Sequence, residues 1–384
     1  MMRILVVNNL YPPQAIGGYE RGIADCARLL KSRGHDVLVL TSNQEKFQVS
    51  HTLSLTEPTV RRNLLLTGTW GEAGAKHFSS DQIPIIITEN QKTLTQELQT
   101  FQPDVCLAGN VDFLEMAFVR AILAAGVPIA HYVMNARPGY LAEYAPRTPL
   151  YQYITCSDWI KNHLQEHGYP TETAQTIYPG AAVEEFYQPY LLPHDHLRIV
   201  YASLVMPYKG ADVLIEALSV LNAMDVEFTA SIAGGSLQPD FVYALKEFVE
   251  SEEMSDRVQF MGALSREQLK ELYLTHNVLV FPSRFQEPFG ISQIEAMAAG
   301  LTLITSGTGG AGEIVEHGND GFIFEAENSL DLADILSSLP RHPEEWEAVT
   351  HAGQQTALHK FNQAHAIEKL ESVLFQLAHL KAHI

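Results

Sequence analysis

The sequence has few cysteines and few basic residues, and each shortage excludes a class of protein. Only 3 of the 384 residues are cysteine, and they are widely spaced, so we expect reduced thiols in a folded core and no disulfide framework. Lysine and arginine total 25 against 45 aspartate and glutamate residues, which gives a formal net charge of −20. This acidic balance argues against a nucleic-acid partner and against broad adsorption to an anionic membrane.

Long hydrophobic runs are also missing. The apolar run that follows Met1 is too short for a secretory signal. No run reaches the roughly 20 residues that a membrane-spanning helix requires. We therefore expect a cytoplasmic protein without a stable membrane span. Arg61 and Arg62, followed by three leucines at 64–66, allow a small peripheral contact at the inner membrane face.

The sequence does contain an alternation of strand-like and helix-like segments, and this alternation occurs twice. Strand-like runs in the first half are predicted at 4–8, 37–41, 105–108, 128–133 and 153–156, with helices at 19–33, 93–101, 113–125 and 157–167. Strand-like runs in the second half are predicted at 198–202, 228–233, 258–261, 278–281, 302–305 and 321–324. The stretch 43–90 shows no assignable pattern. The alternation predicts an α/β protein with two parallel sheets.

The domain organisation follows from this alternation. We expect a first Rossmann-like domain over 1–186, a linker over 187–197 that contains two prolines, and a second Rossmann-like domain over 198–363. The last helix, within 364–384, has no strand after it and could pack back on the first domain. Parallel sheets bind ligands at the carboxyl ends of their strands, so a cleft between the domains is the expected site.

The segment from Phe281 to Gly300 is the most informative part of the chain. A strand is predicted to end at Phe281, and Pro288 is suited to the first position of a helix that Gly300 terminates. The amides at the start of this helix, near Gly290 to Ser292, form an anion site that suits a phosphate.

Two glutamates flank this anion site. Glu287 lies in the loop before the helix, on the side where a sugar would follow a bound phosphate. Glu295 lies about two turns into the helix, where it could accept hydrogen bonds from ribose hydroxyls. Two ordinary surface acids are the alternative interpretation, but the arrangement of loop and helix favours a binding role.

This segment resembles the donor-binding signature of the retaining glycosyltransferases of family 4, also called glycosyl transferases group 1, which have the GT-B fold. Three further motifs resemble the same family: the loop from Asn8 to Glu20 with Gly17 and Gly18, the segment Pro179 to Ala182, and the segment Ser306 to Glu313. The resemblance implies two Rossmann-like domains with parallel sheets facing a central cleft.

The resemblance also implies an activity. The enzyme would move a sugar, with a hexose expected, from a UDP-, GDP- or ADP-sugar donor to an acceptor hydroxyl and retain the anomeric configuration. The acceptor would be a small molecule, a lipid-linked glycan or a polysaccharide. No cofactor and no metal are expected, and the sequence contains no Asp-x-Asp pair that would hold a divalent metal against a diphosphate.

Individual residues take roles from the resemblance. Glu287 would contact the transferred sugar, and Glu295 would contact the donor ribose. Lys209 matches the phosphate-binding lysine of the family, and Lys209 with Glu287 forms the predicted catalytic pair. The remaining predicted donor contacts are Gly290, Ile291, Ser292, Gly17 and Gly18.

The chain departs from the family pattern at two places. Leu204 stands where the family usually has an arginine that shares the diphosphate, so another cation such as Arg284 could take over that contact. The sequence after the strand 128–133 reads Met134-Asn135 in place of the family's His-Asp pair. His131 and Asn135, together with Glu20, are therefore possible sugar or acceptor contacts, and His131 could equally be a buried structural residue.

Two other patterns match known sites less well. Gly307-x-Gly309-x-x-Gly312 matches the dinucleotide fingerprint, but it lies late in the chain and precedes too short a helix. His163 and His167 match a zinc pattern, but the helix that carries them is polar and a third ligand is lacking. Other readings of the whole chain stay open: another GT-B enzyme, such as a sugar-nucleotide epimerase or hydrolase, or a catalytically silent sugar-nucleotide-binding protein.

Overall fold

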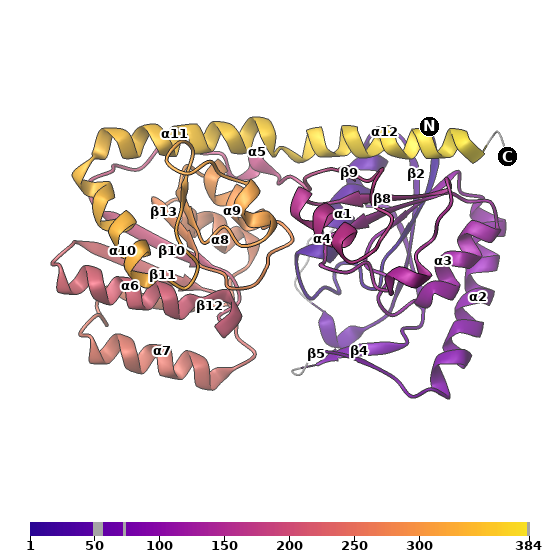
Figure 1. Cartoon of the computed structure of the whole chain (residues 1–384), viewed down its shortest axis with the longest axis horizontal. Coiled ribbons are helices and arrows are strands. Elements are labelled where there is room, and N and C mark those ends of the chain that lie inside the picture. The colour runs from indigo at the N-terminus through magenta and orange to yellow at the C-terminus, as the bar shows by residue number, and fades with distance from the viewer. Residues whose placement is uncertain (49–56, 72–73, 382–384) are drawn as a thin grey trace. The chain divides into compact units, whose positions relative to one another are not determined.

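The computed structural model describes residues 1–48, 57–71 and 74–381, which form two compact units (Figure 1). Unit 1 comprises Met1–Pro179 together with Ala364–Ile384, and unit 2 comprises Gly180–Gln363. Each unit contains its own parallel sheet flanked by helices. The predicted α/β class with two parallel sheets is confirmed.

The sheet of unit 1 has seven parallel strands in the order β3-β2-β1-β6-β7-β8-β9. Its strands are β1 (Arg3–Val7), β2 (Asp36–Ser42), β3 (Thr59–Leu64), β6 (Val105–Ala108), β7 (Ile129–Val133), β8 (Tyr151–Thr155) and β9 (Gln175–Thr176). Strand β6 is buried along its whole length, which explains its continuous apolar sequence. The chain leaves β1 and β6 toward opposite edges, so their carboxyl ends mark the place where ligands bind open α/β sheets.

The helices of unit 1 connect these strands. They are α1 (Gly18–Ser32), α2 (Gln82–Phe101), α3 (Glu115–Ala124), α4 (Asp158–Glu166) and α12 (Gln363–Lys381), with short 3-10 turns η1 (Glu45–Phe47) and η2 (Ala142–Tyr144). Helix α2 begins well before the predicted 93–101. The sequence did not indicate this start, because Ile85 is exposed and the isoleucines of the first turns follow no helical face. The unassigned stretch 43–90 contains β3 and the antiparallel hairpin of β4 (Gly68–Gly71) and β5 (Gly74–His77); residues 49–56 and 72–73 lie outside the described part of the chain.

The last helix, α12, packs on unit 1. Glu371 of α12 accepts hydrogen bonds from Arg33 at 2.7 Å and lies 2.6 Å from the Nε2 atom of His35. Near the helix end, the Nζ atom of Lys381 donates to the carbonyl oxygen of Pro103 at 2.7 Å. The last residues of the predicted helix, 382–384, lie outside the described part of the chain. In the part that the structure describes, no helix has the length and apolar character needed to cross a membrane.

The sheet of unit 2 has six parallel strands in the order β12-β11-β10-β13-β14-β15. Its strands are β10 (Leu197–Ala202), β11 (Phe228–Ala233), β12 (Val258–Gly262), β13 (Val278–Phe281), β14 (Thr302–Thr305) and β15 (Phe322–Ile323). The strand order reverses between β10 and β13, so the carboxyl ends of these two strands are the expected ligand site of this unit.

Helices cover both faces of the unit 2 sheet. They are α5 (Val183–Phe186), α6 (Ala211–Ala223), α7 (Pro239–Ser251), α8 (Arg266–Tyr273), α9 (Ile291–Ala298), α10 (Ser329–Ser338) and α11 (Pro343–Lys360), with the 3-10 turns η3 (Pro207–Lys209), η4 (Gly310–Glu313) and η5 (Leu339–Arg341). Helix α6 packs against α7 and α10, and α9 packs against α11 (Figure 1). Ile199, Leu218 and Ile232 belong to the core between the sheet and α6, and all three are buried.

Candidate functional site

Three loops come together at the carboxyl ends of β10, β13 and β14 in unit 2. They span residues 203–210, 282–290 and 306–313, and the sheet order places their strands side by side. Hydrogen bonds fix the loops to one another. Because these contacts join segments that are distant in the sequence, the position of each loop depends on the whole sheet.

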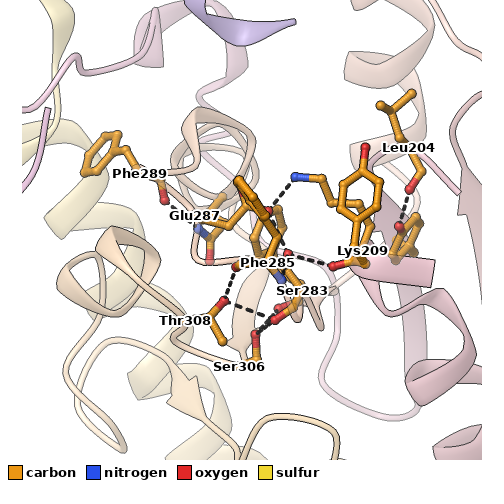
Figure 2. Close-up of polar contacts among 12 residues, drawn as sticks. Leu204, Lys209, Ser283, Phe285, Glu287, Phe289, Ser306 and Thr308 are labelled. Carbon is orange, nitrogen blue, oxygen red and sulfur yellow. Dashed lines mark hydrogen bonds and ion pairs between the residues drawn. The ribbon is translucent and has the colours of Figure 1, made fainter. Parts of the chain in front are cut away.

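The loop after β14 holds the loop that carries Glu287 (Figure 2). The hydroxyl of Thr308 donates to the carbonyl oxygens of Ser283 at 3.0 Å and of Phe285 at 2.7 Å. The amide of Gly310 donates to the carbonyl oxygen of Glu287 at 2.7 Å. The backbone around Glu287 is therefore anchored on both sides.

Lys209 and Glu287 form an ion pair at the centre of this site. The Nζ atom of Lys209 donates to Oε1 of Glu287 at 2.5 Å, and the hydroxyl of Ser283 donates to the same oxygen at 2.7 Å (Figure 2). The ammonium group also lies 5.6 Å from the ring centre of Tyr208 and 5.5 Å from that of Phe285. Glu287 is buried, with 7% of its surface exposed. Since a buried charge is costly without its partner, each residue of this pair stabilises the other.

Two glycines permit this arrangement. Gly210 follows Lys209 with a φ of +72°, and a Cβ atom at that position would lie 1.9 Å from the carbonyl oxygen of Pro282. Gly309 has a φ of +65°, and a Cβ atom there would lie 2.5 Å from the carbonyl oxygen of Glu287. Both positions require glycine because the backbone is left-handed and another backbone passes close by.

Helix α9 begins later than the sequence predicts. The expected start at Pro288 is wrong, because Gly290 has a φ of +118° and interrupts the helical backbone until Ile291. Ile291 and Ser292 are the first two helical residues, so the predicted anion-binding amides still lie at the helix start. The end is as predicted: Gly300 has a φ of +81° and donates to the carbonyl oxygen of Met297 at 3.0 Å.

A buried glutamine at the start of α9 was not singled out from the sequence. Gln293 is fully buried, and its Nε2 atom donates to the carbonyl oxygen of Phe289 at 3.4 Å. Its Oε1 atom is buried and has no hydrogen-bond partner among the described residues. The side chain lies directly beneath Gly290, because a Cβ atom there would come within 2.3 Å of Nε2. Gln293 therefore supports the backbone turn that opens the helix.

Glu295 makes an ion pair that the sequence did not predict. Its Oε1 atom lies 3.1 Å from Nη1 of Arg266, the first residue of α8. Only 10% of the Glu295 side chain is exposed. The pair joins two helices through tertiary packing, so no local sequence signal could have revealed it.

Leu204 stands where the family usually has a diphosphate-binding arginine, and Arg284 is the predicted substitute for it; the structure places the two residues differently. Leu204 lies in the loop after β10, is 41% exposed, and stands on the opposite side of Lys209 from Glu287 in Figure 2. Arg284 donates two hydrogen bonds to the carboxylate of Asp212, at 2.7 and 2.8 Å, and also lies 3.5 Å from Glu327. A donor contact by Arg284 would require it to leave this bidentate pair, so the role stays a prediction.

Unit 1 uses the predicted glycine loop to start helix α1. Gly17 is the N-cap residue and Gly18 begins the helix. The carboxylate of Glu20 accepts hydrogen bonds from the amides of Gly17 at 2.9 Å and Ile16 at 3.2 Å. Burial raises the pKa of Glu20, and these amides counteract that effect. Glu20 therefore holds the loop in place, and a contact with a sugar or acceptor stays a prediction.

His131 and Asn135 differ in exposure. His131 is fully buried in β7, with Nε2 placed to donate to the carbonyl oxygen of Gly109 at 3.0 Å and Nδ1 lying 2.5 Å from the hydroxyl of Tyr151. Asn135 lies in the loop after β7 and is partly exposed. The structure thus places His131 in a buried structural position and leaves Asn135 as the accessible residue of the two.

Because His131 is buried, we expect the folded protein to lose unfolding free energy in mild acid. Burial lowers the pKa of His131 to about 4, and its bond to Gly109 offsets only part of this effect. The pKa of a histidine in the unfolded chain is about 6.5, so the unfolded state takes up the proton first as the pH falls. When the pH falls from 7.5 to 5, the wild type should lose about 2 kcal/mol more unfolding free energy than His131→Gln does. This figure follows from the interval between pH 5 and the unfolded pKa of about 6.5, at about 1.36 kcal/mol per pH unit. Urea unfolding of both proteins at the two pH values measures this difference, and equal pH dependence would contradict it.

The metal and dinucleotide patterns have structural explanations. The rings of His163 and His167 lie with their centres 4.2 Å apart and their planes tilted by 43°, and His167 bonds to the carbonyl oxygen of His163. Across the described ranges, no group of three or more potential ligands is arranged to hold a metal ion. The residues 307–312 lead into η4, a single 3-10 turn, which does not provide the helix start that a dinucleotide pyrophosphate needs.

Two α/β units with parallel sheets and these loop motifs are typical of the GT-B class of glycosyltransferases, and comparison with known families agrees. Residues 16–185 match the family described as Glycosyltransferase Family 4, and residues 183–356 match Glycosyl transferases group 1. The two family models together account for most of the chain. The protein belongs to this glycosyltransferase family.

Curated relatives support the family assignment, and a solved structure supports the GT-B fold. The chain is 30% identical over 181 residues to D-inositol 3-phosphate glycosyltransferase of Mycolicibacterium smegmatis, a match that covers 47% of this chain and 40% of that relative. It is 24% identical to glycogen synthase of Mycobacterium tuberculosis over 94% of this chain and 91% of that relative. Among structures, HepE of Anabaena in complex with UDP and glucose matches with a TM-score of 0.77 and 20% identity, over 98% of this chain and 100% of that chain.

Proposed function

We propose that the protein is a retaining glycosyltransferase that moves a hexose from a nucleotide-diphosphate donor to an acceptor hydroxyl without a metal ion. The observation that carries the proposal is the ion pair of Lys209, in the loop after β10, with Glu287, in the loop that leads from β13 into α9. A cation, a carboxylate and a helix start are the groups that a sugar diphosphate needs. The cation and the helix amides would bind the diphosphate, and the carboxylate would bind sugar hydroxyls.

The reaction follows from these positions. The bond between the anomeric carbon and the diphosphate oxygen breaks while the acceptor oxygen bonds to the same face of that carbon. The proton of the acceptor hydroxyl passes to the departing phosphate. Lys209 and the amides of Ile291 and Ser292 stabilise the charge that gathers on the leaving group. Glu287 holds the sugar hydroxyls and does not need to transfer a proton.

The donor base is proposed from a structural neighbour. HepE of Anabaena was crystallised with UDP and glucose, so UDP-glucose is the first donor to test, followed by GDP- and ADP-sugars. The curated relatives are named for an inositol phosphate and for glycogen. The acceptor panel should therefore contain a phosphorylated polyol, a glucan and a lipid-linked glycan.

A catalytically silent nucleotide-sugar-binding protein is the second candidate, and Leu204 is the observation that favours it. With Leu204 in place of an arginine and Arg284 held by Asp212, Lys209 is the cation on which the diphosphate would depend.

Turnover with each donor, with and without the acceptor panel, separates the candidates. We expect release of nucleoside diphosphate that increases with acceptor, and NMR should show a product with the anomeric configuration of the donor. Release without dependence on acceptor would indicate a hydrolase, and a changed sugar without release would indicate an epimerase. A product of inverted configuration would overturn the retaining assignment, and donor binding without any turnover would favour the silent protein.

A further inference from the structure

Arg266 is fixed at the start of helix α8 by its neighbours. The hydroxyl of Ser265 accepts from the amide of Gln268 at 3.2 Å, and Gln268 returns a contact to the amide of Ser265 at 2.9 Å. This capping box sets the first turn of the helix. The guanidinium of Arg266 lies 4.9 Å from the ring centre of Phe186, so the backbone and the guanidinium are both held.

The guanidinium bridges two carboxylates of unequal exposure. Its Nη1 atom lies 3.1 Å from Glu295, and its Nε atom lies 3.3 Å from Glu185 in α5. The Glu295 side chain is 10% exposed, whereas the Glu185 side chain is 48% exposed. The contact with Glu295 is therefore the more strongly desolvated, and charge pairs of this kind are sensitive to the loss of one partner.

The pairing matters because of what Glu295 would bind. A carboxylate has about four acceptor positions on its two oxygens. One N–H of Arg266 can therefore orient the group while the carboxylate keeps capacity for the two hydroxyls of a ribose. Without the arginine, the Glu295 carboxylate would lose this ion pair and the orientation that the pair gives it.

We infer that Arg266 is a positioning residue that fixes the carboxylate of Glu295 toward the donor ribose and so sets the preference for a ribonucleotide over its deoxy counterpart. This inference rests on the proposed function, in which Glu295 contacts the ribose. Arg266 touches neither the sugar nor the diphosphate. Its effect falls on donor binding and leaves the chemical step unchanged.

Arg266→Met keeps the apolar contact with Phe186 and removes the charge. We expect the KM for the nucleotide-sugar to rise about tenfold, the size of one lost charge-assisted hydrogen bond, while kcat stays within about twofold. Arg266→Lys should recover part of the affinity, because lysine keeps the positive charge but lacks the planar guanidinium group. Lys270→Met is the matched control, because Lys270 lies on the same helix and over the same ring at 6.0 Å.

Calorimetric titration with UDP and with 3′-deoxy-UDP tests the inference directly. Wild type and Lys270→Met should bind UDP at least about tenfold more tightly than 3′-deoxy-UDP, whereas Arg266→Met should bind the two nucleotides with similar affinity. If Arg266→Met is unstable by thermal melting, the same comparison is made with Arg266→Lys, which should show an intermediate preference.

The outcomes separate this inference from the proposed function. If wild type binds GDP or ADP in place of UDP, that nucleotide and its 3′-deoxy form are compared. If wild type and Glu295→Gln bind the nucleotide and its 3′-deoxy form equally, or if wild type binds none of the three nucleotides, the ribose role of Glu295 is wrong and the inference fails with it. If wild type prefers UDP, Glu295→Gln loses that preference and Arg266→Met or Arg266→Lys keeps it in full, the proposed function stands and the role of Arg266 is overturned.

Discussion

Replacing Lys209 with alanine is expected to lower kcat by about two to three orders of magnitude, the usual loss when a group that stabilises developing charge is removed. Lys209 would meet the leaving diphosphate, and Leu204 supplies no second cation at the position where the family usually has one. The variant should also lose stability, because Glu287, whose side chain is 9% exposed, would remain buried without its ion-pair partner. Initial rates of nucleoside diphosphate release and urea unfolding measure the two effects.

Two further variants separate catalysis from stability. Lys209→Met combined with Glu287→Gln removes both charges and should recover stability without recovering kcat. Lys246→Ala is the matched control, since Lys246 also lies over an aromatic ring in unit 2, at 5.4 Å from the ring centre of Phe260, but on α7 away from the site. Near wild-type turnover by Lys209→Ala would remove this residue from the mechanism.

Gly210→Ala should be strongly damaging although it adds only one methyl group. The new methyl group would lie 1.9 Å from the carbonyl oxygen of Pro282, and the backbone at this position has a φ of +72°. The loop that carries Lys209 would have to move. We expect a loss of more than about 3 kcal/mol of unfolding free energy, beyond the roughly 1–2 kcal/mol of a left-handed alanine, together with a large fall in kcat.

Gly262→Ala isolates the cost of the backbone conformation. Gly262 has a φ of +69°, but no atom lies within 4 Å of a Cβ built there. Its replacement should therefore cost only about 1–2 kcal/mol and leave kcat unchanged. Urea unfolding of the two alanine variants gives the comparison. Equal losses would show that the contact with Pro282 does not matter and that the loop adapts.

Buried strands were the most predictable part of the fold. The boundaries of β6, β11, β13 and β14 agree with the sequence. Strands β6 and β13 are continuous apolar runs, which are typical of strands covered on both faces. The first half of α2 was not predicted, since Ile85 is 65% exposed and the apolar residues there follow no helical face. The hairpin of β4 and β5 was also missed because β5 is exposed along its whole length and has no alternation.

The site was predictable where its residues sit at strand ends. Lys209 and Glu287 follow neighbouring strands of one parallel sheet, so their approach follows from topology. The start of α9 was misplaced because Pro288 suits a helix start, whereas the left-handed backbone at Gly290 delays it. The partners of Arg284 and Glu295 depend on how α6 and α8 pack against these loops. Such contacts are set by tertiary structure and carry no local signal.

The central claim is that unit 2 binds a nucleotide-diphosphate donor through Lys209 and the start of α9. Calorimetric titration of UDP, GDP and ADP into wild type, Lys209→Ala and Lys246→Ala tests it most directly. We expect one of the three nucleotides to bind wild type with a stoichiometry of about one, Lys246→Ala to bind it equally well, and Lys209→Ala to bind it at least about tenfold more weakly. The claim is contradicted if none of the nucleotides binds wild type, or if Lys209→Ala binds with unchanged affinity.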